Sequence, residues 1–101
     1  MSRRADADRK KILEDAWIGD AILSLFARVR ILRGDGLQDQ EKFIRMTSNQ
    51  FLAVVGEPSA VEAQIGRAYE REGLEAAFQW IERELMPVFE KQEENRRRRG
   101  K

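Results

Sequence analysis

The segment from Ala16 to Leu32 constrains the fold of this chain most, because it is apolar on two sides of a helix. At 100° of rotation per residue, one broad stripe contains Ile18, Ile22, Leu25, Phe26, Val29 and Leu32. A second side contains Ala16, Leu23, Ala27 and Ile31. A helix that is apolar on both sides is typical of a buried position. We therefore expect a central helix with neighbours on both flanks.

Asp20 falls on the second apolar side, between Ala16, Ala27 and Ile31. A buried carboxylate requires a cationic partner, a proton or a metal ion. We therefore expect Asp20 to be shielded from open water and to have such a partner. Gly19 costs about 1 kcal/mol in a helix relative to Ala. Its presence beside Asp20 predicts the close approach of another backbone or of a ligand.

The composition favours one small helical domain over residues 1–101. Hydrophobic residues make up 42% of the chain and charged residues 37%, only two prolines occur, and alternating β-branched patterns are absent. We expect an all-α fold, a compact bundle of five to six helices. The sequence has neither a membrane-length apolar run nor a secretory pattern at its start. We expect a cytoplasmic protein without a membrane partner.

Cysteine and histidine are both absent from the sequence. Their absence excludes disulfides, thiol chemistry, an imidazole base and zinc sites of the ordinary type. A metal cofactor would therefore be a hard cation held by carboxylates, which means magnesium or manganese.

The net charge of +1 is unevenly distributed along the chain. Residues 1–11 carry +3 and residues 96–101 carry +5, which leaves −7 for residues 12–95. We expect termini without fixed structure at about 1–8 and 95–101. Such tails either keep the protein solvated or bind phosphates through counterion release. The run Arg96, Arg97, Arg98 and Arg99 favours a polyanion partner.

Turn and capping residues divide the chain into helices. A short first helix, capped by Asp6 or Asp8, precedes the central helix, which is expected to end near Arg33 before a turn at 34–36. A third helix is expected over 37–46, with Leu37, Ile44 and Phe43 inward. Residues 47–49 are expected to cap a short fourth helix, which ends at Gly56.

Two more helices are expected in the C-terminal half. The fifth begins at Pro58 with Glu57 or Ser59 near its cap, ends at Gly73, and buries Val61, Ile65, Ala68 and Tyr69. The sixth begins near Leu74 and has a kink or break at Pro87. Its inward residues are expected to be Ala77, Phe78, Ile81, Leu85 and Phe89.

Glu62 lies at the edge of the apolar stripe of the fifth helix, one turn before Gly66. Two helices thus each carry an acid next to a glycine. Two carboxylates converging between helices can hold a magnesium ion that keeps several waters. Such an ion activates water and stabilises charge on a phosphate. In the structural alternative, Asp20 and Glu62 form a cap or an ion pair with Arg28 or Arg67.

Four segments, in order, resemble motifs of the ribonuclease III fold. Residues 16–23 are similar to its signature helix, in which an apolar residue precedes Gly-Asp-Ala and a second apolar residue. Residues 45–53 resemble its Ser-Asn segment followed by Leu-Ala, and residues 59–69 its second acidic motif, Asp-x-x-Glu-Ala-x-x-Gly-Ala-x-Tyr. Residues 73–77 match its Gly-Leu-Glu-x-Ala segment. The resemblance covers roughly residues 13–86.

The resemblance implies a homodimer with the signature helices near its axis, and active sites with four acids and magnesium that cut double-stranded RNA. Asp20 matches the signature Asp and Glu62 the second-motif Glu, so these two are the implied catalytic and metal-binding residues. The other two acids would fall at Ala16 and Ser59. The compact Mini-III subclass is similar in its Gly-Asp-Ala segment and also lacks a carboxylate near the position of Ser59. The stretch from Gly56 to Ser59 is shorter than the loop of the family.

These observations lead to three hypotheses. The first is a ribonuclease III-like homodimer that binds structured or double-stranded RNA through Arg96–Arg99 and cleaves it with magnesium. The second is a catalytically inactive relative that binds RNA or acts in assembly, and the third is a helical dimer with structural acids. Asp15, with a local helix distortion, or Glu14 could replace the acid missing at Ala16. The two tryptophans, Trp17 and Trp80, are interpreted as core or interface residues.

Overall fold

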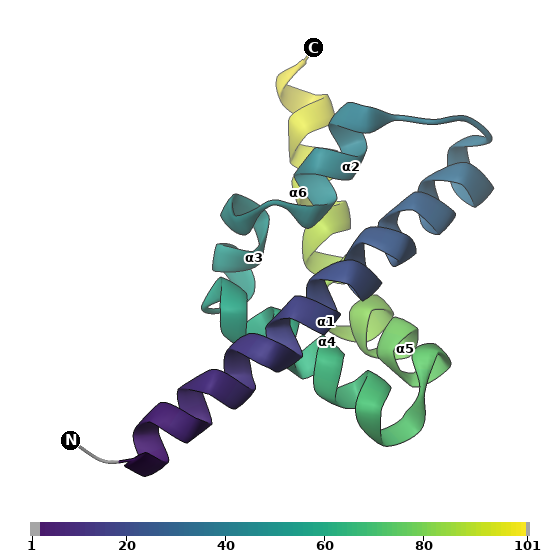
Figure 1. Ribbon diagram of the computed structural model, residues 1–101. Helices are drawn as coiled ribbons and strands as arrows, with labels where there is room; N and C mark the ends of the chain where they lie inside the picture. The colour runs from purple at the N-terminus through teal and green to yellow at the C-terminus, as the bar shows by residue number, and fades with distance from the viewer. Residues whose placement is uncertain (1–2, 101) are drawn as a thin grey trace.

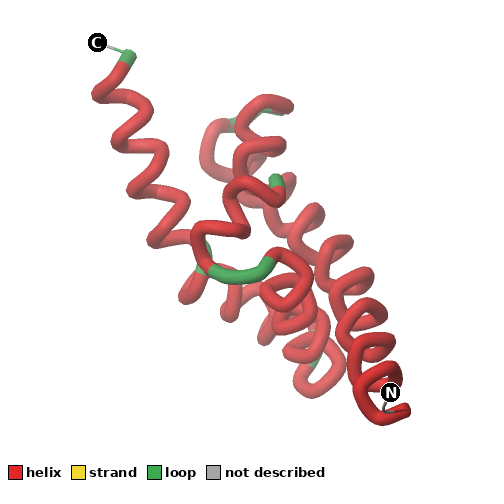
Figure 2. Tube along the Cα trace, turned by 90° about the vertical axis from the view of Figure 1, so that its left-hand side faces the viewer, coloured by secondary structure: helices red, strands yellow, loops and turns green. Residues whose placement is uncertain are grey.

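The computed structural model describes residues 3–100, and in this range the chain forms six α-helices and no strand (Figure 1, Figure 2). The helices are α1 (Arg3–Asp35), α2 (Gln40–Thr47), α3 (Asn49–Val55), α4 (Pro58–Glu72), α5 (Leu74–Glu84) and α6 (Met86–Arg99). The predicted all-α bundle of five to six helices is therefore confirmed. The outermost residues of the two predicted tails, 1–2 and 101, lie outside the described range.

The long helix α1 runs diagonally across the molecule, and its largest contact is with α4 (Figure 1). The sequence predicted two helices here, but residues 3–35 form one, because no proline interrupts them. Gly36 ends the helix in the left-handed region with φ 76°. The second apolar side is buried as expected, whereas Leu25 and Leu32 of the first stripe are exposed. The other helices thus cover α1 incompletely.

Two residues that were predicted to face the core, one before α2 and one within it, are exposed. Asp39 caps α2 by accepting a hydrogen bond from the backbone nitrogen of Lys42 at 3.0 Å. Leu37 therefore precedes the helix and is 64% exposed, and Ile44 on the outer face is 54% exposed. The buried residue of α2 is Met46.

The caps predicted for the next two helices are confirmed. The Ser48 hydroxyl accepts a hydrogen bond from the Phe51 nitrogen at 3.1 Å, and the C-cap of α3 is Gly56. The Glu57 carboxylate accepts one from the Ala60 nitrogen at 2.8 Å and thereby caps α4. In α4, Val61 and Ile65 are buried as predicted, but Tyr69 is 43% exposed.

A proline and a glycine separate the last helices. Gly73, with φ 96°, lies between α4 and α5. The chain leaves α5 at Leu85, and Pro87 occupies the first turn of α6, where the missing N–H of proline costs nothing. The predicted break is therefore confirmed.

Both basic ends are helical where the structure describes them, although the sequence predicted loss of order at about 1–8 and 95–101. Residues 3–8 belong to α1 and residues 95–99 to α6. Glu93 pairs with Arg45 of α2, and Glu94 pairs with Arg98 one turn further on. These ion pairs, together with basic residues at a helix C-terminus, favour continuation of α6.

One hydrophobic core joins residues from all six helices, with Phe26 against Phe78 and Phe51 against Phe89 in edge-to-face contact. Its fully buried members include Leu23, Met46, Leu52, Ile65, Ile81, Leu85 and Met86. Across residues 3–100, none of the helices combines the length and apolarity that a membrane span requires.

Candidate functional site

Two glycines set the distance between α1 and α4. A Cβ atom on Gly19 would lie 1.8 Å from the carbonyl oxygen of Glu62, and one on Gly66 would lie 2.1 Å from the carbonyl oxygen of Asp15. Because real Cβ atoms do not approach backbone so closely, only glycine fits at either position. The close backbone approach predicted at Gly19 is confirmed, and the second helix is α4.

This crossing buries Asp15 and leaves Asp20 exposed, which corrects the expectation that Asp20 is shielded from water. Asp15 has 0% exposure. The contact with α4 covers the side of α1 that carries Asp15 and Gly19, and Asp20 lies at the edge of that contact. The rotation of α1 against α4 therefore decides which acid is buried.

Asp15 belongs to an ion-pair network between α1 and α4. Its Oδ1 lies 3.0 Å from Nζ of Lys11, and its Oδ2 accepts a hydrogen bond from Nε of Arg67 at 3.3 Å. Lys11 also donates to Glu70 at 3.2 Å. Burial on its own raises the pKa of Asp15, but Lys11 and its neighbours outweigh that effect and hold the pKa below its ordinary value. Asp15 is thus an ionised, structural carboxylate.

Arg67 therefore pairs with Asp15. The structural alternative had paired this arginine with Asp20 or Glu62. Arg28, the other arginine considered, lies over the ring of Phe43 at 4.4 Å from its centre. Neither arginine neutralises the two predicted site residues in the described structure.

Asp20 of α1 and Glu62 of α4 are neighbours at the edge of the crossing, where the Asp20 carboxylate acts on the pKa of Glu62. Burial, then the hydrogen bond with Asp20 and its negative charge, raise the pKa of Glu62 to about 7. A proton on Glu62 or a bound cation relieves the repulsion between two adjacent carboxylates. The predicted pair is thus brought together by two helices 42 positions apart in sequence.

The two positions at which the resemblance implies further acids lie on α1 and α4, the helices that carry Asp20 and Glu62. Ala16 is buried in α1, and Ser59 is half-buried in the first turn of α4. Asp15 does not take the place of the missing acid, because it is held by Lys11 and Arg67. Glu14 is exposed. Within residues 3–100, no group of three or more acidic, histidine or cysteine side chains is arranged to hold a metal ion.

The predicted basic residues of the C-terminus do not act as one group. Arg98 pairs with Glu94 at 2.8 Å, whereas Arg96, Arg97 and Arg99 line a groove together with residues of α2 and α3. Sequence reasoning missed the α2 contribution to this groove, Lys42 and Arg45. Their spacing of three on an amphipathic helix, where they share one face, was the available signal.

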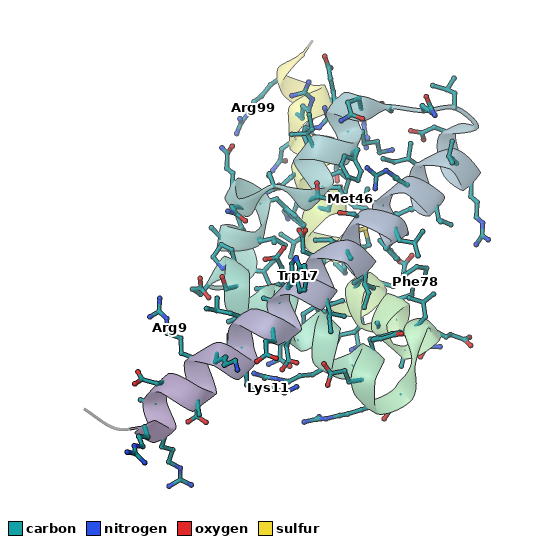
Figure 3. The ribbon with its side chains drawn as sticks, viewed as in Figure 1. Arg9, Lys11, Trp17, Met46, Phe78 and Arg99 are labelled. Atoms are coloured by element: carbon teal, nitrogen blue, oxygen red, sulfur yellow. The ribbon has the colours of Figure 1, made fainter. Side chains whose placement is uncertain are left out.

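The two tryptophans differ in burial. Trp80 packs against the core, as expected. Trp17 is 81% exposed, near the middle of α1 (Figure 3). In this single chain Trp17 is therefore a surface residue, and a role in an interface would require a second molecule.

A comparison of the chain with protein-family models, with curated proteins and with solved structures finds no match in any of the three.

Proposed function

We propose that this chain is a ribonuclease III-like protein that binds structured or double-stranded RNA and hydrolyses phosphodiester bonds with magnesium held by Asp20 and Glu62. The observation that carries the proposal is the proximity of these two carboxyl groups across the α1–α4 crossing, where the two backbones approach at Gly19 and Gly66. The residues that bring them together, Gly19 and Gly66, belong to the same motifs that resemble the ribonuclease III fold.

The donor set of this pair fits a hard divalent cation. Carboxylate oxygens are the preferred ligands of magnesium, which commonly binds through one or two carboxylates and keeps its other waters. A bound cation would displace the proton that Glu62 retains near neutral pH, because it neutralises the charge of both groups. Manganese fits the same donors.

The chain itself would position the RNA and the cation. Asp20 and Glu62 would hold the cation at an exposed edge, where a phosphate can reach it. When bound, such a cation polarises a phosphate oxygen and lowers the pKa of water. The body of the chain, residues 12–95, carries −7, so RNA binding requires the basic ends.

A second candidate function follows from the missing acids. Because no third carboxylate joins Asp20 and Glu62 in the described chain, an RNA-binding or assembly protein without catalysis is the alternative. It shares the RNA partner with the first proposal and differs in the absence of cleavage.

We also propose a homodimer through the exposed face of α1. Leu13, Trp17, Leu25 and Leu32 are exposed apolar residues along this helix. In an antiparallel pair centred on Ala21, Trp17 would contact Leu25 of the partner subunit, and Glu14 would face Arg28 of the partner subunit. The small side chain of Ala21 permits close approach at the axis, and the oppositely charged pair favours this register.

The test combines RNA cleavage with metal binding. We expect the protein to cut a long RNA duplex in the presence of magnesium and to leave 5′-phosphate ends. Asp20→Asn and Glu62→Gln should abolish cutting and weaken Mn²⁺ binding, measured by electron paramagnetic resonance. Asp8→Asn, an exposed acid earlier in α1, is the matched control and should change neither.

Three outcomes separate the hypotheses. Salt-sensitive RNA binding without cleavage at any magnesium or manganese concentration would favour the inactive alternative. Cleavage that persists in both acid variants would contradict the role of the pair. Failure to bind RNA at low salt would overturn both RNA-based functions.

A further inference from the structure

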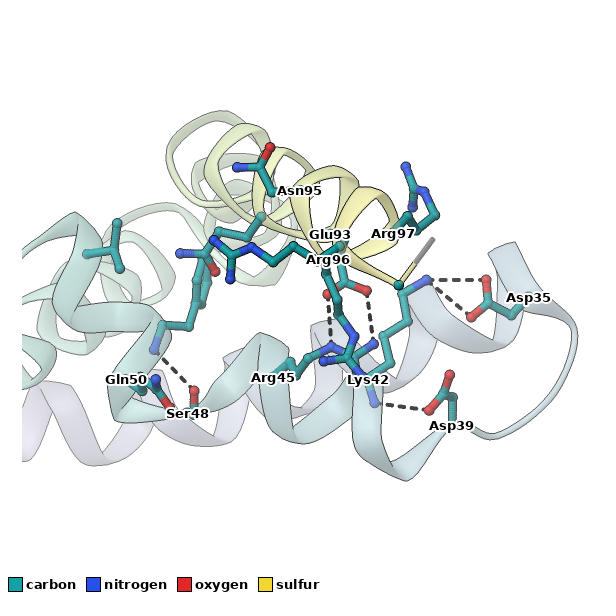
Figure 4. A pocket seen from close by; sticks show the side chains of 15 residues that line it. Asp35, Asp39, Lys42, Arg45, Ser48, Gln50, Glu93, Asn95, Arg96 and Arg97 are labelled. Carbon is teal, nitrogen blue, oxygen red and sulfur yellow. Dashed lines mark hydrogen bonds and ion pairs between the residues drawn. The ribbon is translucent and has the colours of Figure 1, made fainter.

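A groove of about 1080 Å³ separates the C-terminal half of α6 from α2 and α3 (Figure 4). Five basic side chains and three acidic ones line it. The basic ones are Lys42, Arg45, Arg96, Arg97 and Arg99. The groove therefore concentrates positive charge on a protein whose body is acidic.

The charges in the groove divide into paired and unpaired groups. Arg45 donates two hydrogen bonds to Glu93, at 2.8 and 2.9 Å, and Lys42 contacts both oxygens of Asp35, at 3.2 and 3.3 Å. These four side chains neutralise each other. Asp39 caps α2 and keeps its negative charge, so the lining has a net formal charge of +2.

Three arginines supply the remaining charge of the groove. Arg96, Arg97 and Arg99 make no ion pair within residues 3–100, and each is exposed. Their guanidinium groups are therefore available to an anionic ligand from outside the chain. Planar guanidinium groups match the oxygens of a phosphate.

The rotation of α6 about its own axis decides which of its arginines line the groove. Arg96 and Arg99 are three residues apart and share the side of the helix that faces the groove, together with Gln92. Arg98 lies on another side, where it pairs with Glu94. The run of four arginines thus divides between the groove and the outer surface.

The other lining residues indicate which part of a nucleic acid fits. Ser48, Gln50, Gln92 and Asn95 are uncharged polar residues of the lining. The lining includes one aromatic residue, Phe51, which is 3% exposed and packs on Phe89, so it offers no face for base stacking. Phosphates, and not bases, match this surface.

We propose that the groove binds the phosphodiester backbone of RNA independently of base sequence, with Arg96, Arg97 and Arg99 as the phosphate-binding residues. This inference rests on the proposed RNA-binding function and names the site on the protein that makes the contact. Contacts to phosphates release counterions, so the affinity depends on salt and not on the order of the bases.

The experiment measures the dissociation constant for two RNA duplexes of unrelated sequence over about 50 to 200 mM salt. Arg96→Gln/Arg99→Gln should lower the slope of log affinity against log salt by about 2, and weaken binding of both duplexes equally. The matched control is Lys91→Gln/Arg98→Gln, which removes the same charge from α6 outside the groove and should preserve most of the slope. Arg96→Lys/Arg99→Lys, which keeps the charge, should also preserve it.

Circular dichroism would establish that each variant remains helical. Equal losses in the two glutamine double variants would overturn the groove proposal and assign binding to the diffuse charge of the tail. An unchanged slope in Arg96→Gln/Arg99→Gln would also overturn it, while RNA binding itself would stand. A difference in affinity between the two duplexes would contradict sequence independence, and absence of RNA binding by the unaltered protein would overturn both this inference and the proposed function.

Discussion

Gly19 of α1 and Gly66 of α4 let the backbones of the two helices touch, because each position lies against a carbonyl oxygen of the other helix. The same contact buries Asp15 and brings Asp20 to Glu62. The stability of the fold and the geometry of the candidate site therefore depend on two residues without side chains.

Gly19→Ala and Gly66→Ala should each destabilise the protein by about 3 kcal/mol, because a methyl group would collide with backbone atoms that cannot rotate away. Gly34→Ala is the matched control. It lies in the same helix as Gly19 with nothing within 4 Å of its added Cβ, so alanine should be neutral or stabilising by up to about 1 kcal/mol. Urea denaturation measures both effects. Equal stability of Gly19→Ala and the unaltered protein would contradict the close crossing.

Asp15→Asn should cost about 2 to 4 kcal/mol of unfolding free energy at pH 7, because it removes the buried partner of Lys11 and Arg67. The pKa of Asp15 is lowered in the folded state, so its stabilising contribution is present above its unfolded value of about 3.8 and is lost as pH falls through the folded value. The difference between the two proteins should therefore vanish in strong acid. Asp8→Asn, two turns earlier in α1 and exposed, should show no comparable loss in urea denaturation at either pH.

Glu62→Gln should change how stability depends on pH. The pKa of Glu62 is raised from 4.5 to about 7 in the folded state, so the native protein binds the extra proton between these values and loses stability as pH rises through this window. The glutamine variant should lack this loss, worth about 1 kcal/mol after solvent screening of a half-buried group. Thermal unfolding at pH 4.5 and pH 8 measures it. Glu72→Gln, exposed at the end of α4, is the control, and identical pH profiles for Glu62→Gln and the unaltered protein would refute the prediction.

The proposed dimer predicts a charge-reversal pattern on α1. Glu14→Arg should weaken self-association, because like charges would face each other across the antiparallel pair, and the combination with Arg28→Glu should restore it. Sedimentation equilibrium measures both. A double variant that associates no better than Glu14→Arg would contradict this register.

Trp17→Gln should leave the stability of the monomer within about 0.5 kcal/mol, because the side chain is 81% exposed, yet weaken self-association. Chemical denaturation of dilute samples and sedimentation at higher concentration separate the two effects. A large loss of monomer stability would show that Trp17 packs within its own chain.

Four of the helix boundaries were predicted from local chemistry, although the Asp39 cap of α2 was missed. Ser48 and Glu57 cap helices because their side chains reach backbone nitrogens within three residues. Gly73 separates α4 from α5 because glycine readily adopts a positive φ. Pro87 marks the start of α6 because proline lacks the N–H that a helix interior requires. The same local reasoning began the first helix at Asp6 or Asp8 and divided residues 3–35 into two helices, whereas they form one helix with Asp6 in its first turn.

The orientation of side chains was predicted less well, because it depends on neighbours distant in sequence. Leu37, Ile44 and Tyr69 were expected inside and lie at the surface, since the bundle leaves those sides of its helices uncovered. The groove between α2 and α6 likewise joins segments about 50 positions apart. Periodicity indicates which residues share a face of a helix, but not which face is covered.

By itself, the sequence determined an all-α chain, several of its caps and breaks, and the need for close approach at Gly19, and it supplied the hypothesis that two acids form the candidate site. Only the tertiary structure decided that Asp15 is the buried carboxylate, that Asp20 and Glu62 are neighbours at an exposed edge, and that Arg98 lies apart from the groove. The reason is physical: caps and turns arise from atoms a few residues apart, whereas burial and ion pairing depend on how whole helices rotate and cross.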